Sequence, residues 1–325
     1  MNISYDSMSA ELGTPPGWDF GDCAYGLEPL LLPEPLTPGD DEPPHRAPPG
    51  LDVARLCPSL LAGAATDRAA APAPAREPAG AQVYWFRWIT GHQVSFLLWR
   101  LLGQQMRVAS GSVGERRTEA LAAMTAYVRG YCAMLLYTSS CPRGVYEGLI
   151  RPSMFLQHPG FSGTWAPDFG AVRPLLRGRG AARWADNPVG ARLRQAVAVH
   201  HTIHSGVAAR LVPGGRSLLQ EATRTAEVRG PRMLGTLYDN YFLTVRLPQS
   251  PPEILAQLLR RLEAVAVDLR ANGLYDAAYD EDLPAELCEN DVVECGRDVP
   301  RVLLRLAGHA AGLDAEALGV QLESV

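Results

Sequence analysis

Three histidines lie within one segment, Gln195 to Ser217, most of which has the apolar periodicity of a helix. On a period of 3.6 residues, His200 and His204 share one face with apolar side chains. The apolar residues of this face are Leu193, Val197, Val207 and Leu211. A buried imidazole needs a hydrogen bond or a metal, because an unpartnered polar group away from water costs about 1 to 3 kcal/mol. The pattern therefore predicts either hydrogen-bonded core histidines or ligands of a metal or haem iron, for which neutral imidazole is a common donor.

Another histidine, His92, lies in a second segment with helical periodicity, from Gln82 to Gly111. Phe96 and Trp99 follow it by four and seven residues, so we expect the three side chains to share a face and point inward. Taken alone, His92 is most simply interpreted as a core histidine bonded to a backbone carbonyl.

Two irregular segments could line a pocket beside these helices. The first, from His158 to Phe169, is rich in turn residues yet contains Phe161 and Trp165, which favours a pocket wall, with a buried structural loop as the alternative. In the second, Gly214 and Gly215 end the three-histidine helix and leave backbone amides beside Arg216 and Ser217. Such a turn could hold a carboxylate, and an ordinary helix C-cap is the alternative.

Composition and motifs exclude several classes of protein. The chain has 325 residues, 47% of them hydrophobic, a net charge of -5, and 30 basic residues that are all arginine. We interpret the abundant arginine as coding bias and expect no nucleic-acid partner. No apolar run reaches about 18 residues and no signal peptide is recognisable, so we expect a cytoplasmic protein without a membrane span. The six cysteines form no CxxC or CxxCH motif, which predicts free thiols and argues against covalent haem or a zinc ribbon.

Helices are the recurring element, and they indicate one mostly α domain. Further helices are expected over Thr118–Tyr137, over Gly144–Leu156 with a break at Arg151-Pro152, over Glu253–Ala271 and over Val299–Gly312, with a short strand near Phe242–Leu247. Residues 1–80 are dense in proline, which disfavours long helices there. We therefore predict a helical bundle over residues 81–325 and an irregular arm over residues 1–80 that lies on the body or on a neighbouring subunit.

Three motifs in order resemble those of tryptophan 2,3-dioxygenases, a haem family. ITGHQVSFLLWRLL is similar to that family's HQ…ELWF helix, PSMFLQHPGFSG to its substrate loop, and HHTIHSGVAARLVPGGRS to its proximal-histidine helix and GTGG turn. Phe96 stands where the family has glutamate and PGG replaces GTGG, which argues against tryptophan cleavage. The stretch RPSMFLQHPGFSGTWAPDF and the proline-rich start more closely resemble the actinobacterial haem-dependent L-tyrosine 3-hydroxylases of the same superfamily.

The resemblance implies a fold like that of tryptophan 2,3-dioxygenase around a non-covalent haem b. It implies conversion of L-tyrosine to L-DOPA with hydrogen peroxide, for antibiotics of the pyrrolobenzodiazepine and lincosamide type, by a homodimer. His92 is then the distal catalytic histidine and His200 the axial iron ligand, whose other ring nitrogen should donate to an acceptor. The resemblance also places His204 and Trp99 at the haem. The expected substrate contacts are Phe161, Ser162, Trp165, Gly214, Gly215, Ser217 and Arg151.

Two alternatives stay open at this point. The same haem site could act on another aromatic amino acid, such as a methylated tyrosine or tryptophan. A protein of a different class would bind no haem and would use His200 and His204, four residues apart, for zinc or non-haem iron. The HExxH glutamate of a zinc protease is missing, because His201 and Thr202 follow His200.

Overall fold

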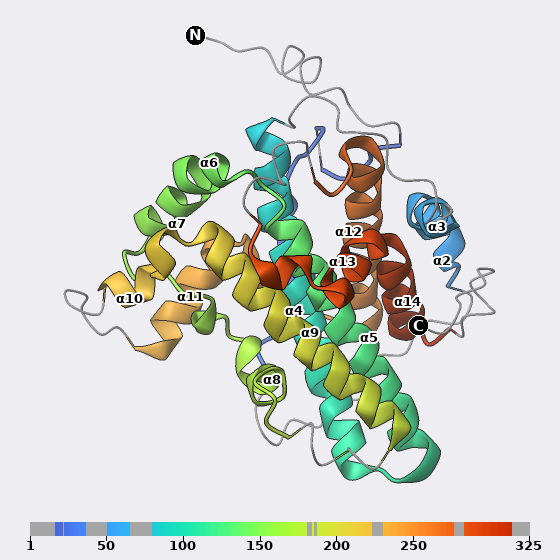
Figure 1. The fold of residues 1–325 in the computed structure, drawn as a ribbon. Helices are drawn as coiled ribbons and strands as arrows, with labels where there is room; N and C mark the ends of the chain where they lie inside the picture. The colour runs from blue at the N-terminus through green and yellow to red at the C-terminus, as the bar shows by residue number, and fades with distance from the viewer. Residues whose placement is uncertain are drawn as a thin grey trace.

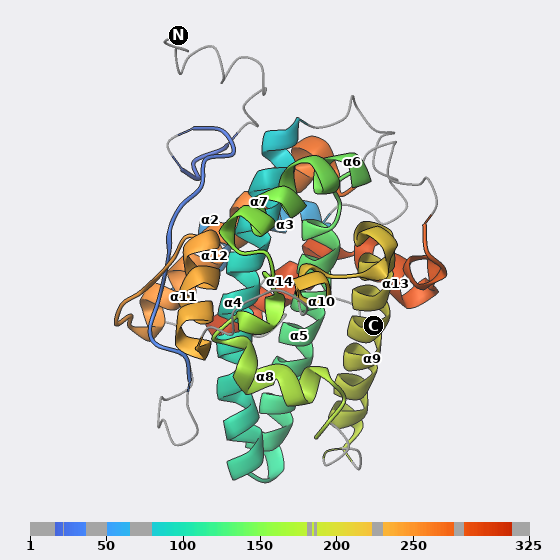
Figure 2. The ribbon, with the colours of Figure 1, turned by 90° about the vertical axis from the view of Figure 1, so that its left-hand side faces the viewer.

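Three long helices form the centre of the protein. The computed structural model describes residues 17–21, 23–36, 51–65, 80–180, 184, 187–222, 230–275 and 283–313. Helices α4 (Ala81–Gly111) and α5 (Gly114–Thr138) form a hairpin joined by two residues, and α9 (Pro188–Leu211) packs on α5. Figure 2 shows the three side by side, with α5 between α4 and α9. His92 and His200 therefore lie on helices separated by α5.

Helices α4 and α5 pack closely together next to His92. A Cβ atom added to Gly91 would lie 2.4 Å from Cγ2 of Thr138 and 3.2 Å from Cδ1 of Tyr137, so only glycine fits there without movement of α5. The residues of α4 from Val94 to Leu98 are all buried, which explains why a helix with so few charged residues is stable in this position.

Shorter helices cover the two sides of this layer (Figure 1). On one side lie α2 (Val53–Leu56), α3 (Pro58–Ala65), α12 (Pro251–Asn272) and α14 (Val299–Ala311), which pack on one another and on the hairpin. On the other side lie α6 (Arg143–Val145), α7 (Arg151–Gln157), α8 (Phe169–Leu176), α10 (Leu218–Ala222) and α11 (Pro231–Tyr241), while α13 (Asn290–Arg297) covers part of α9 and α5. The prediction of a mostly α fold is confirmed, and no helix in the described ranges is long and apolar enough to cross a membrane.

The described part of the N-terminal arm adds a strand to the body. Strand β1 (Leu30–Leu32) pairs in parallel with β2 (Thr244–Arg246), within the segment where the sequence indicates a strand. The side chains of Leu30 and Leu32 are 0% exposed, and the Phe20 ring is buried against Phe86 of α4. The linker over Thr66–Gly80 lies outside the described residues, apart from Gly80.

The expected break at Arg151-Pro152 does not occur. Instead, residues Tyr146–Ile150 form a π turn that leads directly into α7, and the Arg151 amide donates to the Tyr146 carbonyl five residues earlier. Pro152 has no N–H to donate, but it lies in the first turn of α7, where that loss is tolerated. The helix therefore continues through the wider π turn and does not break at Pro152.

Candidate functional site

His92 lies between two aromatic rings. Its imidazole stacks on Phe242 at 4.3 Å between ring centroids and 17° between planes, and Trp88 lies 4.3 Å away on the same helix. His92 Nδ1 donates to the Trp88 carbonyl oxygen at 2.6 Å, so Nε2 carries the lone pair. Burial lowers the pKa of His92 to about 4 and outweighs the opposing effect of the Trp88 carbonyl. The hydrogen bond to a backbone carbonyl that the sequence suggests for His92 is present. It leaves a neutral imidazole whose Nε2 can accept a proton.

His200 is buried and lacks the hydrogen bond that such a group needs. Its ring stacks on Tyr131 of α5 at 5.1 Å and 27°. Its Nδ1 is buried without a hydrogen-bond partner among the described residues, so the acceptor expected for that nitrogen is not found there. Burial, with smaller contributions from His204 and His201, lowers the pKa of His200 to about 3. His200 is therefore a neutral imidazole with one buried nitrogen that no described residue satisfies.

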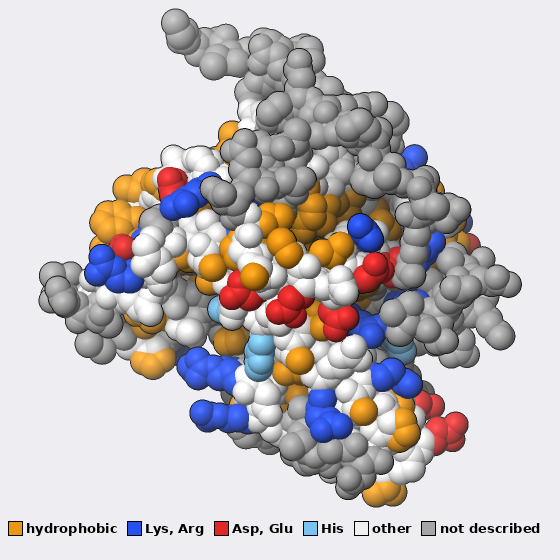
Figure 3. Space-filling view, viewed as in Figure 1, with side chains coloured by type: hydrophobic (Ala, Val, Ile, Leu, Met, Phe, Trp, Pro, Cys, Tyr) orange, Lys and Arg blue, Asp and Glu red, His pale blue; other side chains and the backbone are white. Residues whose placement is uncertain are grey.

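The other two histidines of α9 differ from His200. His201 hydrogen-bonds through Nε2 to the Leu176 carbonyl of α8, on an exposed part of the helix. His204 is exposed, so the prediction that it points into the core is wrong. Near His204, α9 packs closely against Leu287 at Gly206. The face of α9 that carries His204 stays exposed. Figure 3 shows histidine atoms at the surface on this side of the molecule.

A continuous chain of rings connects the half-buried His92 to the buried His200. Phe242 packs on Phe96 at 5.5 Å, Phe96 on Trp99 at 5.4 Å, and Trp99 on Tyr131 at 5.4 Å, which in turn stacks on His200. Trp99 Nε1 is buried and has no hydrogen-bond partner among the described residues. The structure thus places His92, Trp99 and His200 along one aromatic cluster, without stacking the two imidazoles on each other.

The segment from His158 to Phe169, called the aromatic loop below, contacts this cluster at its His92 end. The Phe161 ring is buried and lies 5.3 Å from Tyr238 at 13° and 4.7 Å from Tyr241, both on α11. Trp165 meets the edge of Phe161 at 5.7 Å. Ser162 has a local role, because its hydroxyl accepts from the Thr164 amide and caps the short turn Gly163–Trp165.

The expected carboxylate-binding residues gather at the end of α9. Arg151 donates to Glu221 at 2.9 Å and to the Arg216 carbonyl at 3.3 Å. Ser217 is bonded to Gln220 through both its amide and its hydroxyl, while Gly214 and Gly215 are exposed with φ of 60° and 70°. Arg151 also hydrogen-bonds Tyr146, whose ring lies 6.2 Å from Trp88. Among these residues, Arg151 is therefore the one that contacts the surroundings of His92.

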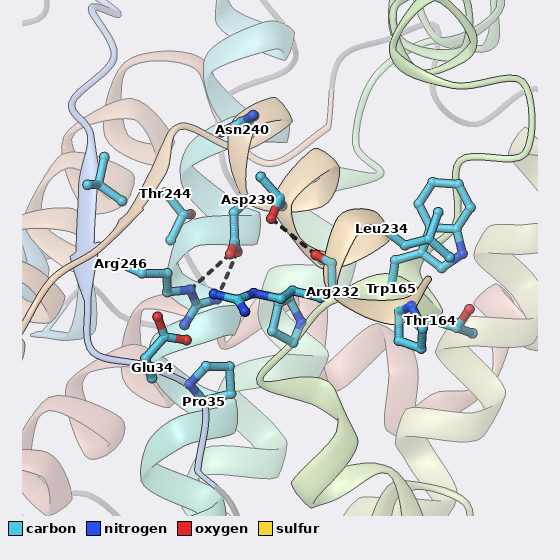
Figure 4. Close-up of a pocket in the computed structure, with 15 residues that line it drawn as sticks. Glu34, Pro35, Thr164, Trp165, Arg232, Leu234, Asp239, Asn240, Thr244 and Arg246 are labelled. Atoms are coloured by element: carbon cyan, nitrogen blue, oxygen red, sulfur yellow. Dashed lines mark hydrogen bonds and ion pairs between the residues drawn. The ribbon is translucent and has the colours of Figure 1, made fainter. Parts of the chain in front are cut away.

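A cavity of about 650 Å³ lies beside α11 and β2 (Figure 4). Of the expected site residues only Trp165 lines it, and none of the histidines in the described ranges does. Arg246 lies at the cavity, where it donates to Asp239 at 2.8 Å and to Asp168 at 2.7 Å. We take the histidines as the candidate site and not this cavity, because Arg246 in the cavity wall is already paired with Asp239 and Asp168.

Five aromatic residues of the cluster were not identified from the sequence. Trp88 precedes His92 by about one helical turn, a spacing that is visible in the sequence. Tyr238, Tyr241 and Phe242 are spaced to share a helix face, a signal that the sequence analysis had not connected to His92. Tyr131 lies on the helix over Thr118–Tyr137, and nothing in its local sequence separates it from the other core residues.

Comparison with known families agrees with an oxidative enzyme. Residues 51–199 match the family model described as SfmD 3-methyl-L-tyrosine peroxygenase. This segment of the chain resembles a peroxygenase family. It spans a little under half of the chain, contains His92 and the aromatic loop, and ends one residue before His200. No curated protein matches the chain.

Proposed function

We propose that the protein is a haem-dependent enzyme that hydroxylates L-tyrosine at ring C3 with hydrogen peroxide and forms L-DOPA. The observation that carries this proposal is the buried, neutral and unpartnered imidazole of His200, joined through aromatic rings to the neutral His92. The match to a peroxygenase family supports the reaction class. The service of an antibiotic pathway is part of the same proposal and rests on the resemblance.

The donor set fits a haem better than a bare metal ion. A zinc or non-haem iron site needs three or more protein ligands, and no such group of His, Cys, Asp or Glu occurs in the described ranges. A haem iron needs only one axial ligand from the protein, which His200 can supply. His201 is unsuitable because its Nε2 already bonds to Leu176, and His204 lies one turn further on at the surface.

A bound haem would supply the iron at which peroxide is activated for transfer of one oxygen atom to the substrate ring. His92 has a specific task in this reaction. Its Nε2 can accept a proton from hydrogen peroxide and return it to the departing oxygen, while the bond from Nδ1 to Trp88 fixes the tautomer. Such acid–base help contributes about 10² to 10⁴-fold to a rate. The low pKa keeps this nitrogen unprotonated at neutral pH.

The aromatic loop and α11 are the proposed substrate wall. Phe161 and Trp165 can stack on the substrate ring, and Arg151 can exchange its partner Glu221 for the substrate carboxylate. Hydrogen bonds to a phenol hydroxyl would reject phenylalanine by up to about 10⁴ to 10⁵-fold. A second candidate substrate is 3-methyl-L-tyrosine, which is named in the description of the matching family.

The visible spectrum of the purified full-length protein, loaded with haem during expression, tests the proposal. We expect a Soret band that shifts on addition of L-tyrosine, and a product heavier by one oxygen atom when peroxide is supplied. A shift with 3-methyl-L-tyrosine and none with L-tyrosine would transfer the proposal to the methylated substrate. A colourless protein after haem supply would overturn both.

A further inference from the structure

The ring of Phe242 covers His92. It is 1% exposed and nearly parallel to the imidazole, while Trp88 lies against the same imidazole at a tilt of 54°. Burial is the main cause of the low pKa of His92, and the rings of Phe242 and Trp88 provide part of that burial.

Phe242 lies in a turn at the end of α11. It follows the last residue of that helix, and the next residue, Leu243, adopts a left-handed φ of 52°, which is costly for a residue with a bulky side chain. Within the turn, the Phe242 amide donates to the Tyr238 carbonyl at 3.2 Å and the Thr244 hydroxyl donates to the Phe242 carbonyl at 3.4 Å. Two further hydrogen bonds come from other elements. The Phe242 carbonyl accepts from Gln93 Nε2 at 3.0 Å, and the Leu243 carbonyl accepts from the Leu30 amide of β1 at 2.9 Å.

Gln93 connects three parts of the chain. It is 1% exposed and follows His92 on α4, so its side chain leaves the helix about 100° away from the imidazole. Its Nε2 donates to the Glu28 carbonyl as well as to that of Phe242, both at 3.0 Å, and its Oε1 accepts from Arg261 Nε at 3.0 Å. Arg261, also 1% exposed, donates in turn to the Pro29 carbonyl at 3.0 Å.

We propose that Gln93 is a positioning residue that holds Phe242 on His92. Together with Arg261 it fastens the Phe242 carbonyl and the arm residues Glu28 and Pro29 to one point beside α4. The arm is then part of the structure that shapes the site, and it acts through Phe242. The catalytic meaning rests on the proposed role of His92, whereas the position of the ring can be measured without haem or substrate.

Two titratable side chains lie next to Trp88, the neighbour of His92. The phenol of Tyr241 on α11 accepts from Trp88 Nε1 at 3.2 Å, and the ring of Tyr146 on the π turn lies 6.2 Å from Trp88. Arg151 is the charged group next to Tyr146. Burial raises the pKa of both phenols, so they are uncharged near neutral pH. Water exclusion by Phe242 and Trp88 is therefore the effect that a displaced ring would change.

Histidine-labelled NMR of the full-length protein tests the proposal, in the ferrous carbon monoxide form where haem copurifies. In Gln93→Met, which removes the hydrogen bonds at similar size, we expect the ring-current shift of the His92 ring protons to shrink and the His92 pKa to rise by about one unit or more. Gln93→Glu keeps an acceptor for Arg261 and so retains the fold, but it cannot donate to Phe242, and it should lose the same ring-current shift.

Gln257→Met is the matched control. Gln257 anchors the same arm through the Leu31 amide and carbonyl, at 2.8 and 2.9 Å, and its side chain makes no hydrogen bond to Gln93 or Phe242. It should lower stability and leave the His92 signals unchanged. Unchanged His92 signals in both Gln93 variants, or equal changes in Gln257→Met, would overturn the proposal, whatever the spectrum with haem shows.

Discussion

At the scale of single residues, the partner of each imidazole decides what it can do. His92 and His201 each bond to a backbone carbonyl, through Nδ1 and Nε2 respectively, and they keep different nitrogens free. His200 has a buried Nδ1 with no partner in the described part of the chain. Three chemically identical side chains thus differ in role: His92 is the proposed base, His201 a structural contact and His200 the proposed ligand.

The first prediction concerns the axial ligand. His200→Ala should lose haem retention, because the buried imidazole is the proposed bond to iron. Haem content per chain, measured from the Soret band and the protein concentration, checks this. His201→Ala, which removes an exposed ring of the same helix, serves as the control and should retain haem. If His200→Ala retained haem and His204→Ala lost it, the axial ligand would be His204, one turn further along α9.

The second prediction follows from the low pKa of His92. The folded value is about 4 and the unfolded value about 6.5, so the unfolded chain takes up a proton first as the pH falls. The stability that His92 contributes is therefore complete above about pH 6.5 and is lost towards pH 4, by up to about 1.4 kcal/mol per pH unit. Burial of His200 acts in the same direction.

Urea unfolding of the wild type and of His92→Asn at pH 7, 6 and 5 measures this effect. The fall in unfolding free energy between pH 7 and pH 5 should be smaller in the variant. His309→Asn, at an exposed position of α14, should leave the slope unchanged. Parallel curves for wild type and His92→Asn would show that His92 titrates alike in both states.

Residue spacing was sufficient to single out His92 and His200 but not their partners. Each shares a helix face with apolar residues, a pattern that is visible in the sequence. Their stacking partners Phe242 and Tyr131 come from other helices, so only tertiary packing brings them together. The prediction failed at His204 because periodicity gives the direction of a side chain and not whether another element covers it.

At the scale of elements, the position of His92 depends on the close contact of α4 and α5. The third prediction is that Gly91→Ala destabilises the protein by about 1 to 3 kcal/mol, because its methyl group would lie 2.4 Å from Thr138. Gly111→Ala on the same helix has open space and should be neutral or stabilising by up to about 1 kcal/mol. Thermal unfolding compares the two, and equal transition temperatures would show that the hairpin yields without cost.

The helices themselves were predictable because their apolar periodicity is local. The segments 82–111, 118–137 and 253–271 correspond to α4, α5 and α12. Helix α9 ends at Leu211, just before the predicted glycine turn. The π turn at Tyr146–Ile150 was not predictable, since it depends on how the backbone accommodates Pro152 within a helix that remains continuous.

At the scale of the whole molecule, the central question is whether the arm unfolds with the body. Leu30 and Leu32 are completely buried, whereas Leu31, between them on β1, points to the other side and is only partly buried. Arg260 and Arg261 of α12 also bond to arm residues Asp19, Glu28 and Pro29. These contacts connect the arm to α12 as well as to β2.

The fourth prediction is that Leu32→Ala lowers the stability of the entire protein by about 2 to 5 kcal/mol, as expected for a truncated core leucine. Leu31→Ala should cost clearly less, although it changes the same residue type in the same strand. Calorimetry distinguishes the two possible relations of arm and body. A single transition that moves to lower temperature in Leu32→Ala means that arm and body unfold cooperatively. An early transition that appears beside an unmoved main one would make the arm a separate unit, and the turn at Phe242 would then keep its hydrogen bond from Gln93 but lose the one that the Leu30 amide donates to Leu243.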